Sequence, residues 1–354
     1  MNKVFSILKE KKSIPLDRFI NISLYDKDLG YYMKKNPFGE KGDYITSPLV
    51  SVLFGEMIAI WCVAFWESLG KPKKIFIVEL GPGDASLSKD LLNTFKNFKS
   101  FYKCLEIRLL EKSNNLKSIQ KKNIKNKKVK WIKKINEIKF GPIIFLGNEF
   151  FDALPIKQFY INKKIALEKH VSLSENNQKL EFSYKKAKKG IVQNMRKLDL
   201  ISQGNIVEYP LDSIKYLELI SKNINNYGGC LLCFDYGYIK KKNKNTLQSV
   251  KKHKYQNILS NPGNADITSH INYNLFIKIL KKNNLKVEKI VNQSEFFYKL
   301  GIIERANIVS KQMNFKKKAD LFYRLQKLLH NNEMGSLFKV LFAHKDNTKF
   351  TLGF

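Results

Sequence analysis

Residues 78–87 read VELGPGDASL, an apolar run that breaks into Gly-Pro-Gly and then turns into a helical pattern. Gly81 and Gly83 allow the backbone to turn tightly and bring a ligand close to bare main chain. The helix that follows would offer unpaired backbone N–H groups in its first turn. A strand, a glycine turn and a helix in this order predict a ligand-binding βα unit, with an acid, Glu79, inside the strand.

The segments around this turn alternate between strands and helices. Helical patterns cover 86–98 and 114–122, and strands are predicted at 74–80, 104–113, 128–132, 141–150, 230–237, 285–291 and 336–345. This alternation predicts an α/β fold with right-handed βαβ units and a mainly parallel sheet of about seven strands, the last two closing it. Ligands of such sheets bind outside the carboxyl ends of the strands.

The rest of the chain adds further segments to this sheet. Residues 1–70 read as mostly helical, and residues 157–187 alternate polar and apolar side chains around Asn-rich turns, which predicts a β insertion. Residues 237–272 read mainly as a loop. The expected domains are an N-terminal helical region with an active-site loop over 1–70, and a core over 71–354 with insertions at about 157–205 and 237–272.

The composition indicates a globular and strongly basic chain. It has 354 residues, 44% of them hydrophobic, which is enough for a sizeable core, and a formal net charge of +33. The excess is mostly Lys, and Lys, Asn and Ile crowd together throughout, as codon bias in an AT-rich coding sequence would produce. We therefore favour a solvated basic surface and expect no nucleic-acid partner, with a patch for RNA or an acidic protein as the alternative.

The cysteines predict packing, and no metal site is expected. Cys230 and Cys233 form a CxxC pattern within a predicted buried strand, where positions three apart point to opposite faces. Apolar packing of reduced thiols therefore outweighs zinc or redox chemistry. No apolar run reaches about 18 residues, and the N-terminus has no signal or transit pattern, so we expect no membrane span and a cytoplasmic protein.

Three details favour S-adenosylmethionine (SAM) as the ligand of the glycine turn. The dinucleotide pattern GxGxxG requires Gly where this chain has Ser86. Glu79 suits a ligand with an ammonium and a sulfonium group, and suits a pyrophosphate badly. Glu111 ends the second strand and can accept hydrogen bonds from both ribose hydroxyls, although this would fit NAD nearly as well. A plain βα turn without a ligand is the remaining alternative.

A second group of polar residues follows the fourth and fifth strands. Asn148, Glu149 and Asp152 stand beside two phenylalanines, and two carboxylates with an amide beside aromatic rings suit a cationic acceptor. Asp235 ends the fifth strand at the same rim, and His270 lies in a polar loop. As alternatives, Asp152 or His270 caps a helix, and Asp235 accepts hydrogen bonds from loop N–H groups.

The segment 42–48, GDYITSP, is a turn-rich loop with three hydroxyl side chains. It could fold over the ends of the strands, or its hydroxyls could cap the helix that begins near Pro48, and both roles can hold together. The predicted cofactor contacts are Tyr44, Thr46, Ser47, Glu79, Gly81, Gly83, Glu111 and Asn148.

Seven stretches together resemble one protein family, in order and over nearly the whole chain. They are GYY (30–32), GDYITSP (42–48), FGEMIAIW (54–61), VELGPGDASL (78–87), NEFFDALPIKQF (148–159), PGNADITSHINY (262–273) and MGSLFKVLFAHK (334–345). On these stretches the chain resembles the MidA family of class I SAM-dependent methyltransferases, which includes the mitochondrial complex I assembly factor.

The resemblance implies a seven-stranded Rossmann-like methyltransferase core, SAM as the methyl donor and a protein arginine as the acceptor. A subunit of respiratory complex I is one candidate for the protein partner, and a homodimer is one candidate assembly. The chain departs from the family at one point, because the family reads Gly-Pro-Gly-Arg-Gly where this chain has Asp84 and Ala85. We expect Ala85 to keep a helix-start geometry and Asp84 to place an anion beside the ligand.

For arginine methylation we expect Glu149 and Asp152 to grip the guanidinium, with Asp235 or His270 as the proton acceptor. The guanidinium stays protonated, so a carboxylate that holds its charge on the distal nitrogens leaves the attacking nitrogen more nucleophilic. Three other functions stay open on the sequence: an NAD(P)-dependent oxidoreductase, an RNA methyltransferase, and a SAM-binding assembly chaperone without turnover.

Overall fold

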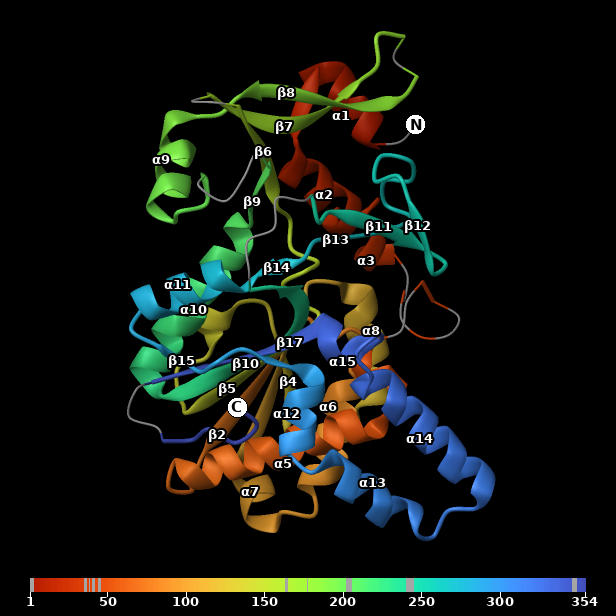
Figure 1. The fold of residues 1–354 in the computed structure, drawn as a ribbon, viewed down its shortest axis with the longest axis vertical. Helices are drawn as coiled ribbons and strands as arrows, with labels where there is room; N and C mark the ends of the chain where they lie inside the picture. The colour runs from red at the N-terminus through yellow and green to blue at the C-terminus, as the bar shows by residue number, and fades with distance from the viewer. Residues whose placement is uncertain are drawn as a thin grey trace. The chain divides into compact units, whose positions relative to one another are not determined.

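The computed structural model describes residues 3–34, 37, 39, 42–43, 46–162, 165–176, 178–201, 206–239, 245–345 and 349–354. The chain divides into two compact units, whose elements are labelled in Figure 1. The first comprises Met1–Tyr44, Phe151–Tyr216 and Tyr238–Lys278, and the second comprises Ile45–Phe150, Leu217–Gly237 and Ile279–Phe354. The expected division into an N-terminal region and a core stays a prediction.

The second unit is built on a mixed sheet with strand order β15-β17-β10-β5-β2-β3-β4. Its strands are β2 (Ile75–Leu80), β3 (Leu105–Leu110), β4 (Val129–Ile132), β5 (Ile143–Asn148), β10 (Gly229–Tyr238), β15 (Lys286–Val287) and β17 (Phe338–His344). The strands from β10 to β4 run parallel, whereas β17 and β15 are antiparallel. The predicted α/β fold with a mainly parallel sheet is confirmed, and the closing strands are antiparallel.

The number of strands in this sheet differs from the predicted seven. The predicted strand at 285–291 is two short strands, β15 and β16 (Val291–Asn292), which both pair with β17. Between them, the Glu288 N–H donates to the Phe342 carbonyl. The sheet therefore has more members than the seven predicted.

Both faces of this sheet are buried, which explains the nearly continuous apolar strands. Ile75 and Ile77 of β2 belong to the hydrophobic core shared with α5 (Val52–Ser68) and α6 (Ser86–Phe95), and Phe76 and Val78 on the opposite face are also buried. The unit's other helices are α4 (Ser47–Val50), α7 (Lys99–Cys104), α8 (Asn114–Asn123), η1 (Ile135–Glu137), α12 (Gln293–Lys299), α13 (Ile302–Ser310), α14 (Phe315–Leu329) and α15 (Met334–Leu337).

The predicted packing role of the CxxC pattern is confirmed. Cys230 and Cys233 are fully buried in β10, and burial raises the pKa of Cys230 well above its usual value. Among the described residues, no group of three or more His, Cys, Asp or Glu could hold a metal ion. No described helix is both long and apolar enough to cross a membrane.

The first unit contains two smaller antiparallel sheets. The larger consists of β1 (Ser13–Pro15), β6 (Lys157–Asn162), β7 (Ile165–Leu173), β8 (Leu180–Lys186) and β9 (Ile206–Tyr209), which confirms the β insertion. The smaller consists of β11 (Gln248–Lys251), β12 (Lys254–Gln256) and β13 (Asp266–Thr268), so the prediction of a plain loop at 237–272 is wrong. These strands of three or four residues are too short to show an alternating pattern.

Helices α1 (Lys3–Lys11) and α2 (Leu16–Tyr25) of the first unit pack on its larger sheet (Figure 1). The unit also contains α3 (Tyr31–Lys34) and α9 (Lys189–Lys197). The short β14 (Ile271–Asn272) follows β13, and α10 (Leu211–Tyr227) and α11 (Tyr273–Lys282) each contain residues of both units.

A substitution at Gly229 would test the pairing of the central strands. It begins β10 with φ +111°, and a Cβ there would overlap the backbone of Ile143 on β5. We predict that Gly229→Ala lowers the free energy of unfolding by at least about 2 kcal/mol, because it adds both backbone strain and overpacking. Urea unfolding measures the change.

The control for this prediction is Gly190→Ala on α9, where an added Cβ meets no atom within 4 Å. It should leave the free energy of unfolding unchanged or raise it by about 0.5–1 kcal/mol, because Ala loses less conformational freedom than Gly in a helix. A Gly229→Ala protein as stable as the unmodified chain would contradict the pairing of β5 with β10.

Candidate active site

The glycine turn after β2 adopts the conformation that its sequence predicts. Gly81 has φ +63° and Gly83 has φ +57°, both in the left-handed region that favours glycine. A Cβ on Gly81 would lie 2.9 Å from the ring of Phe150. The segment after β5 therefore packs directly against the turn, and only glycine allows this approach.

Ala85 and Asp84, the two residues that depart from the family pattern, both help to shape the end of the turn. Ala85 is left-handed, with φ +68° and ψ 25°, which costs roughly 1–2 kcal/mol for a residue with a Cβ. The expected helix-start geometry at Ala85 is therefore wrong, and a glycine, which the resemblance implies at this position, would adopt this conformation without that cost. The Asp84 carboxylate accepts a hydrogen bond from the Ser86 N–H (3.0 Å), so it satisfies a backbone donor at the start of α6.

Glu79 is a buried acid whose carboxylate points at α6. It accepts a hydrogen bond from the Ser88 hydroxyl. Burial raises the pKa of Glu79 to about 8, and the nearby charges of Asp84 and Glu111 act in the same direction. Two neighbouring carboxylates thus disfavour the charged form of Glu79 in a chain that is strongly basic overall, and a cationic ligand would favour that form.

Glu111 directly follows β3, and both of its carboxylate oxygens accept hydrogen bonds from the protein. One comes from the Ser113 N–H (2.7 Å) and the other from the Gln120 side-chain amide (3.0 Å). Burial raises the pKa of Glu111. The same Gln120 amide donates to the Gly83 carbonyl (2.8 Å), so α8 links the acid after β3 to the glycine turn.

Sequence reasoning missed the residues that support this turn. Gln120 is fully buried, and Asn123, one helical turn later, donates to the Asp84 carbonyl (2.9 Å). Nothing in the lysine-rich segment around them distinguishes them as site residues, because the helix reads as a solvated one. The spacing of three residues, which places both amides on one face, is the only available signal.

Asn148 and Glu149 lie where β5 ends. Glu149 has φ +50°, and its carboxylate accepts hydrogen bonds from the Ser47 N–H (3.3 Å) and the Asn148 amide (3.1 Å). A residue with a side chain that is held in the left-handed region often belongs to a functional site. Thr46 stands at the N-cap position of α4 and its side chain makes no cap hydrogen bond, so the predicted hydroxyl cap is wrong. The Glu149 carboxylate accepts the hydrogen bond from an N–H in the first turn instead.

Two buried polar atoms beside this segment have no hydrogen-bond partner among the described residues. They are the Ser47 hydroxyl oxygen and the Asn148 amide oxygen. A buried polar atom without a partner is costly, so both are available to a ligand that donates hydrogen bonds. Tyr44, the third predicted contact of this loop, lies outside the described residues.

Asp235 follows the last residue of β10 that pairs with β5. Its carboxylate is fully buried and accepts a hydrogen bond from the Tyr236 N–H (2.9 Å). The Glu149 N–H donates to the Phe234 carbonyl (2.9 Å), so Glu149 and Asp235 stand at the ends of neighbouring strands. The structure therefore brings these two predicted catalytic residues to one rim.

Asp152 and His270, the other two predicted catalytic residues, belong to the first unit. Asp152 is buried, and its backbone carbonyl accepts a hydrogen bond from the Ser269 N–H (3.0 Å). No helix begins in the described segment between Asp152 and β6, and Asn272 caps α11 by accepting from the Leu275 N–H (3.2 Å). Both alternative cap roles, for Asp152 and for His270, are therefore wrong.

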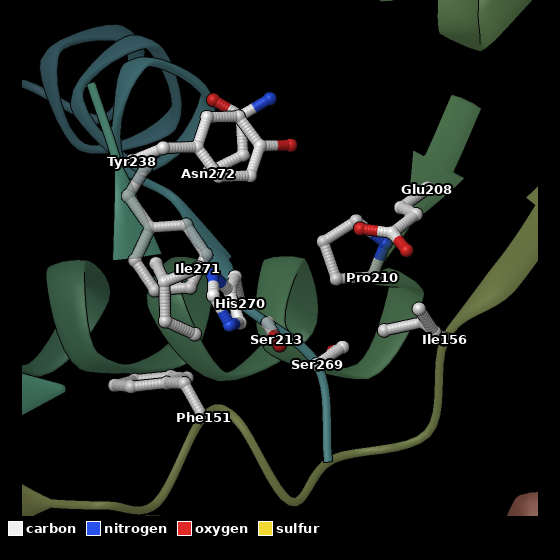
Figure 2. A pocket seen from close by; sticks show the side chains of 11 residues that line it. Phe151, Ile156, Glu208, Pro210, Ser213, Tyr238, Ser269, His270, Ile271 and Asn272 are labelled. Carbon is white, nitrogen blue, oxygen red and sulfur yellow. The ribbon is translucent and has the colours of Figure 1, made fainter. Parts of the chain in front are cut away.

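His270 lines a pocket of the first unit together with Glu208, Ser213 and Tyr238 (Figure 2). The Thr246 hydroxyl donates to Glu208 (2.6 Å) and accepts from the His270 N–H (3.0 Å). Burial raises the pKa of Glu208. The loop that carries His270 is thus fixed by polar contacts, and its role as a proton acceptor stays a prediction.

The residues around the glycine turn fit SAM in their chemistry. The turn brings bare backbone to the ends of β2 and β3, and Glu79 and Glu111 offer carboxylates to cationic and hydroxyl groups. The Ser47 and Asn148 oxygens, which have no partner in the part of the chain that the structure describes, offer two further acceptors. The residue-by-residue contacts remain predictions.

Comparison with known proteins identifies the family. The family model described as "Putative S-adenosyl-L-methionine-dependent methyltransferase" matches residues 57–291. Protein arginine methyltransferase NDUFAF7, mitochondrial, from Xenopus tropicalis is 28% identical over 96% of this chain and 84% of that protein. The homolog from Caenorhabditis elegans, also named mitochondrial, is 30% identical over 92% of this chain and 81% of its own length.

One solved structure shows the same fold. A protein from Burkholderia thailandensis, bound to S-adenosyl-homocysteine, has a TM-score of 0.83 and 20% sequence identity, over 98% of this chain and 92% of that one. The predicted cytoplasmic localisation is wrong, because the sequence relatives are named as mitochondrial proteins. Since the family model spans more than half of the 354 residues, the chain belongs to the family of S-adenosyl-L-methionine-dependent methyltransferases.

Proposed function

We propose that this methyltransferase transfers a methyl group to an arginine side chain of a protein. The relatives that align with most of the chain are named protein arginine methyltransferases. The observation that carries the proposal is Glu149, a carboxylate held at the rim of the sheet in a left-handed conformation by the Ser47 N–H and the Asn148 amide. A fixed carboxylate at this place suits a guanidinium.

SAM is the cofactor of this family, and when bound it supplies an electrophilic methyl group. We assign the glycine turn, Thr46 and Ser47, and Asn148 to its binding. Glu79 would face its ammonium and sulfonium charges, and Glu111 would accept hydrogen bonds from its ribose hydroxyls. The buried carboxylates and the unpartnered oxygens beside the turn support this assignment.

The chain's own residues would act mainly by orientation. Holding a nucleophile in line with the group it attacks can contribute about 7–11 kcal/mol to lowering a barrier. Glu149 would keep the guanidinium charge on its distal nitrogens, and Asp235 on the neighbouring strand would accept the proton that leaves the attacking nitrogen. The roles of Asp152 in gripping the guanidinium and of His270 as a second proton acceptor belong to the same proposal.

The acceptor protein and the assembly are further parts of the proposal. A subunit of respiratory complex I as the acceptor and a homodimer as the assembly both stay predictions. A chaperone without turnover is less well supported, because the altered turn keeps its left-handed geometry and the site keeps its carboxylates. An oxidoreductase is excluded by the family match.

Glu149→Gln tests the proposed grip on the guanidinium. Glutamine keeps an oxygen for the Ser47 N–H but removes the negative charge, so we expect methyl transfer to fall by roughly 100-fold or more while SAM affinity changes less than about threefold. The assay follows labelled methyl groups into the macromolecules of a hypomethylated extract, with and without ribonuclease, and identifies methylarginine after hydrolysis of the labelled protein.

The control for this variant is Glu295→Gln, which removes a half-exposed carboxylate on α12 that pairs with Lys299. It should leave methyl transfer unchanged. Full turnover by Glu149→Gln would eliminate the proposed grip, and label that disappears with ribonuclease would point to an RNA acceptor instead.

The raised pKa of Glu79 predicts that SAM binding depends on pH. Below about pH 8 the Glu79 carboxyl is mostly protonated in the free protein, because burial disfavours its charge. A cationic ligand binds the ionised form more tightly, so binding should release a proton and the Kd should fall roughly tenfold as the pH rises from about 6.5 to about 8.5.

Calorimetric titration in buffers of different ionisation enthalpy measures both the affinity and the released protons. Glu79→Gln should bind SAM more weakly and lose the Glu79-dependent part of the pH profile. The ligand's own amine titrates in the same way with both proteins, so the difference between the two pH profiles reports Glu79. Identical pH profiles would show that Glu79 does not face the cationic end of the ligand.

A further inference from the structure

Gln120 is a polar side chain with no exposed surface, and its hydrogen-bonding groups all have partners. Its amide nitrogen donates to the Gly83 carbonyl (2.8 Å) and to the Glu111 carboxylate (3.0 Å). Its amide oxygen accepts from the indole N–H of Trp131 on β4 (2.8 Å). These three bonds connect the ends of β2, β3 and β4 through one residue of α8.

The chemistry of the partners fixes which way this amide points. An indole N–H can only donate, and a carbonyl and a carboxylate can only accept, so the amide oxygen must face Trp131 and the amide nitrogen must face Gly83 and Glu111. A flipped amide would place its oxygen against two acceptors and its nitrogen against a donor. Trp131 therefore determines the orientation of the Gln120 amide, and this amide in turn fixes the position of one carboxylate oxygen of Glu111.

The other oxygen of Glu111 is held by the Ser113 N–H (2.7 Å). The Lys112 backbone N–H also hydrogen-bonds this carboxylate, so donors from several directions fix both its position and its plane. A carboxylate has about four acceptor sites, so acceptor capacity remains for a ligand. The two neighbouring hydroxyls of a ribose are donors that suit it.

We propose that Gln120 is a positioning residue, oriented by Trp131, that holds Glu111 for recognition of a ribose diol and locks the glycine turn to the same acid. This inference rests on the proposed function, in which Glu111 receives the ribose of the cofactor. Gln120 touches no reacting atom, so its loss should reduce discrimination for the diol more than it reduces chemistry.

The test compares two ligands in three variants. Calorimetry gives the Kd for S-adenosylhomocysteine and for its 2′,3′-dideoxy analogue, and the ratio of the two values measures recognition of the diol. We expect a ratio on the order of 100-fold for the unmodified chain, because the analogue leaves buried acceptor sites unpaired. For Gln120→Leu the ratio should fall below about tenfold, and Trp131→Phe should lower it in the same direction by a smaller amount.

The matched control is Gln293→Leu, which removes another fully buried glutamine of the same unit, whose amide donates to the Leu328 carbonyl (3.0 Å). It should reduce stability while leaving the ratio unchanged. A purely structural role for Gln120 would make Gln120→Leu behave like this control, and that outcome would overturn the inference.

Two further readouts keep the inference falsifiable. Trp131 is one of three tryptophans, so in the ligand-free protein its indole N–H resonance is assigned by Trp131→Phe and should be the one that Gln120→Leu shifts. An unshifted resonance would contradict the Trp131–Gln120 bond. Absence of SAM binding by the unmodified chain would defeat the proposed function, whereas tight binding with an unchanged ratio in both variants would defeat this inference alone.

Discussion

The parallel pairing of β2 with β3 and β5 determines where the glycine turn, Glu111 and Glu149 stand. Leu80 pairs with Leu110 on one side and Gly147 on the other, so the three strands end nearly level. Because parallel strands deliver their carboxyl ends to one edge, the residues that follow them meet there. The glycine turn follows β2, Glu111 follows β3 and Glu149 follows β5. A shift of one residue in any pairing would separate these groups.

This edge carries backbone strain that the surrounding contacts must offset. Ala85 and Glu149 both occupy the left-handed region despite having side chains. Around Ala85, the Asp84 carboxylate accepts a hydrogen bond from the Ser86 N–H. Side chains of α8 donate hydrogen bonds to the carbonyls of Gly83 and Asp84. The departure from the family's Arg-Gly is therefore accommodated within the chain, and the anion introduced at residue 84 is engaged with the start of α6.

The sequence predicted the parts of the fold that depend on local pattern. The buried strands have continuous apolar runs, and the turn has glycines at two left-handed positions, so β2, the turn and the acid after β3 could be located from the residues alone. Gln120 could not, because a glutamine in a lysine-rich helix looks solvated until the contacts with Trp131 and Glu111 bury it. The three-stranded sheet over β11, β12 and β13 was missed because its strands are too short for a periodic signal.

The distribution of charge has a consequence for binding. The chain carries a net charge of +33, yet Asp84 and Glu111 lie close enough to Glu79 for both to disfavour its ionisation. Such a group of acids is unfavourable without a counter-charge, since burial and mutual repulsion act together. Lys117 partly offsets the effect of burial on Glu111, whereas lysines farther away on the surface are screened by solvent and salt. A ligand that brings its own positive charge into the site would relieve this repulsion directly, which supports the proposed placement of a sulfonium and ammonium ligand beside Glu79.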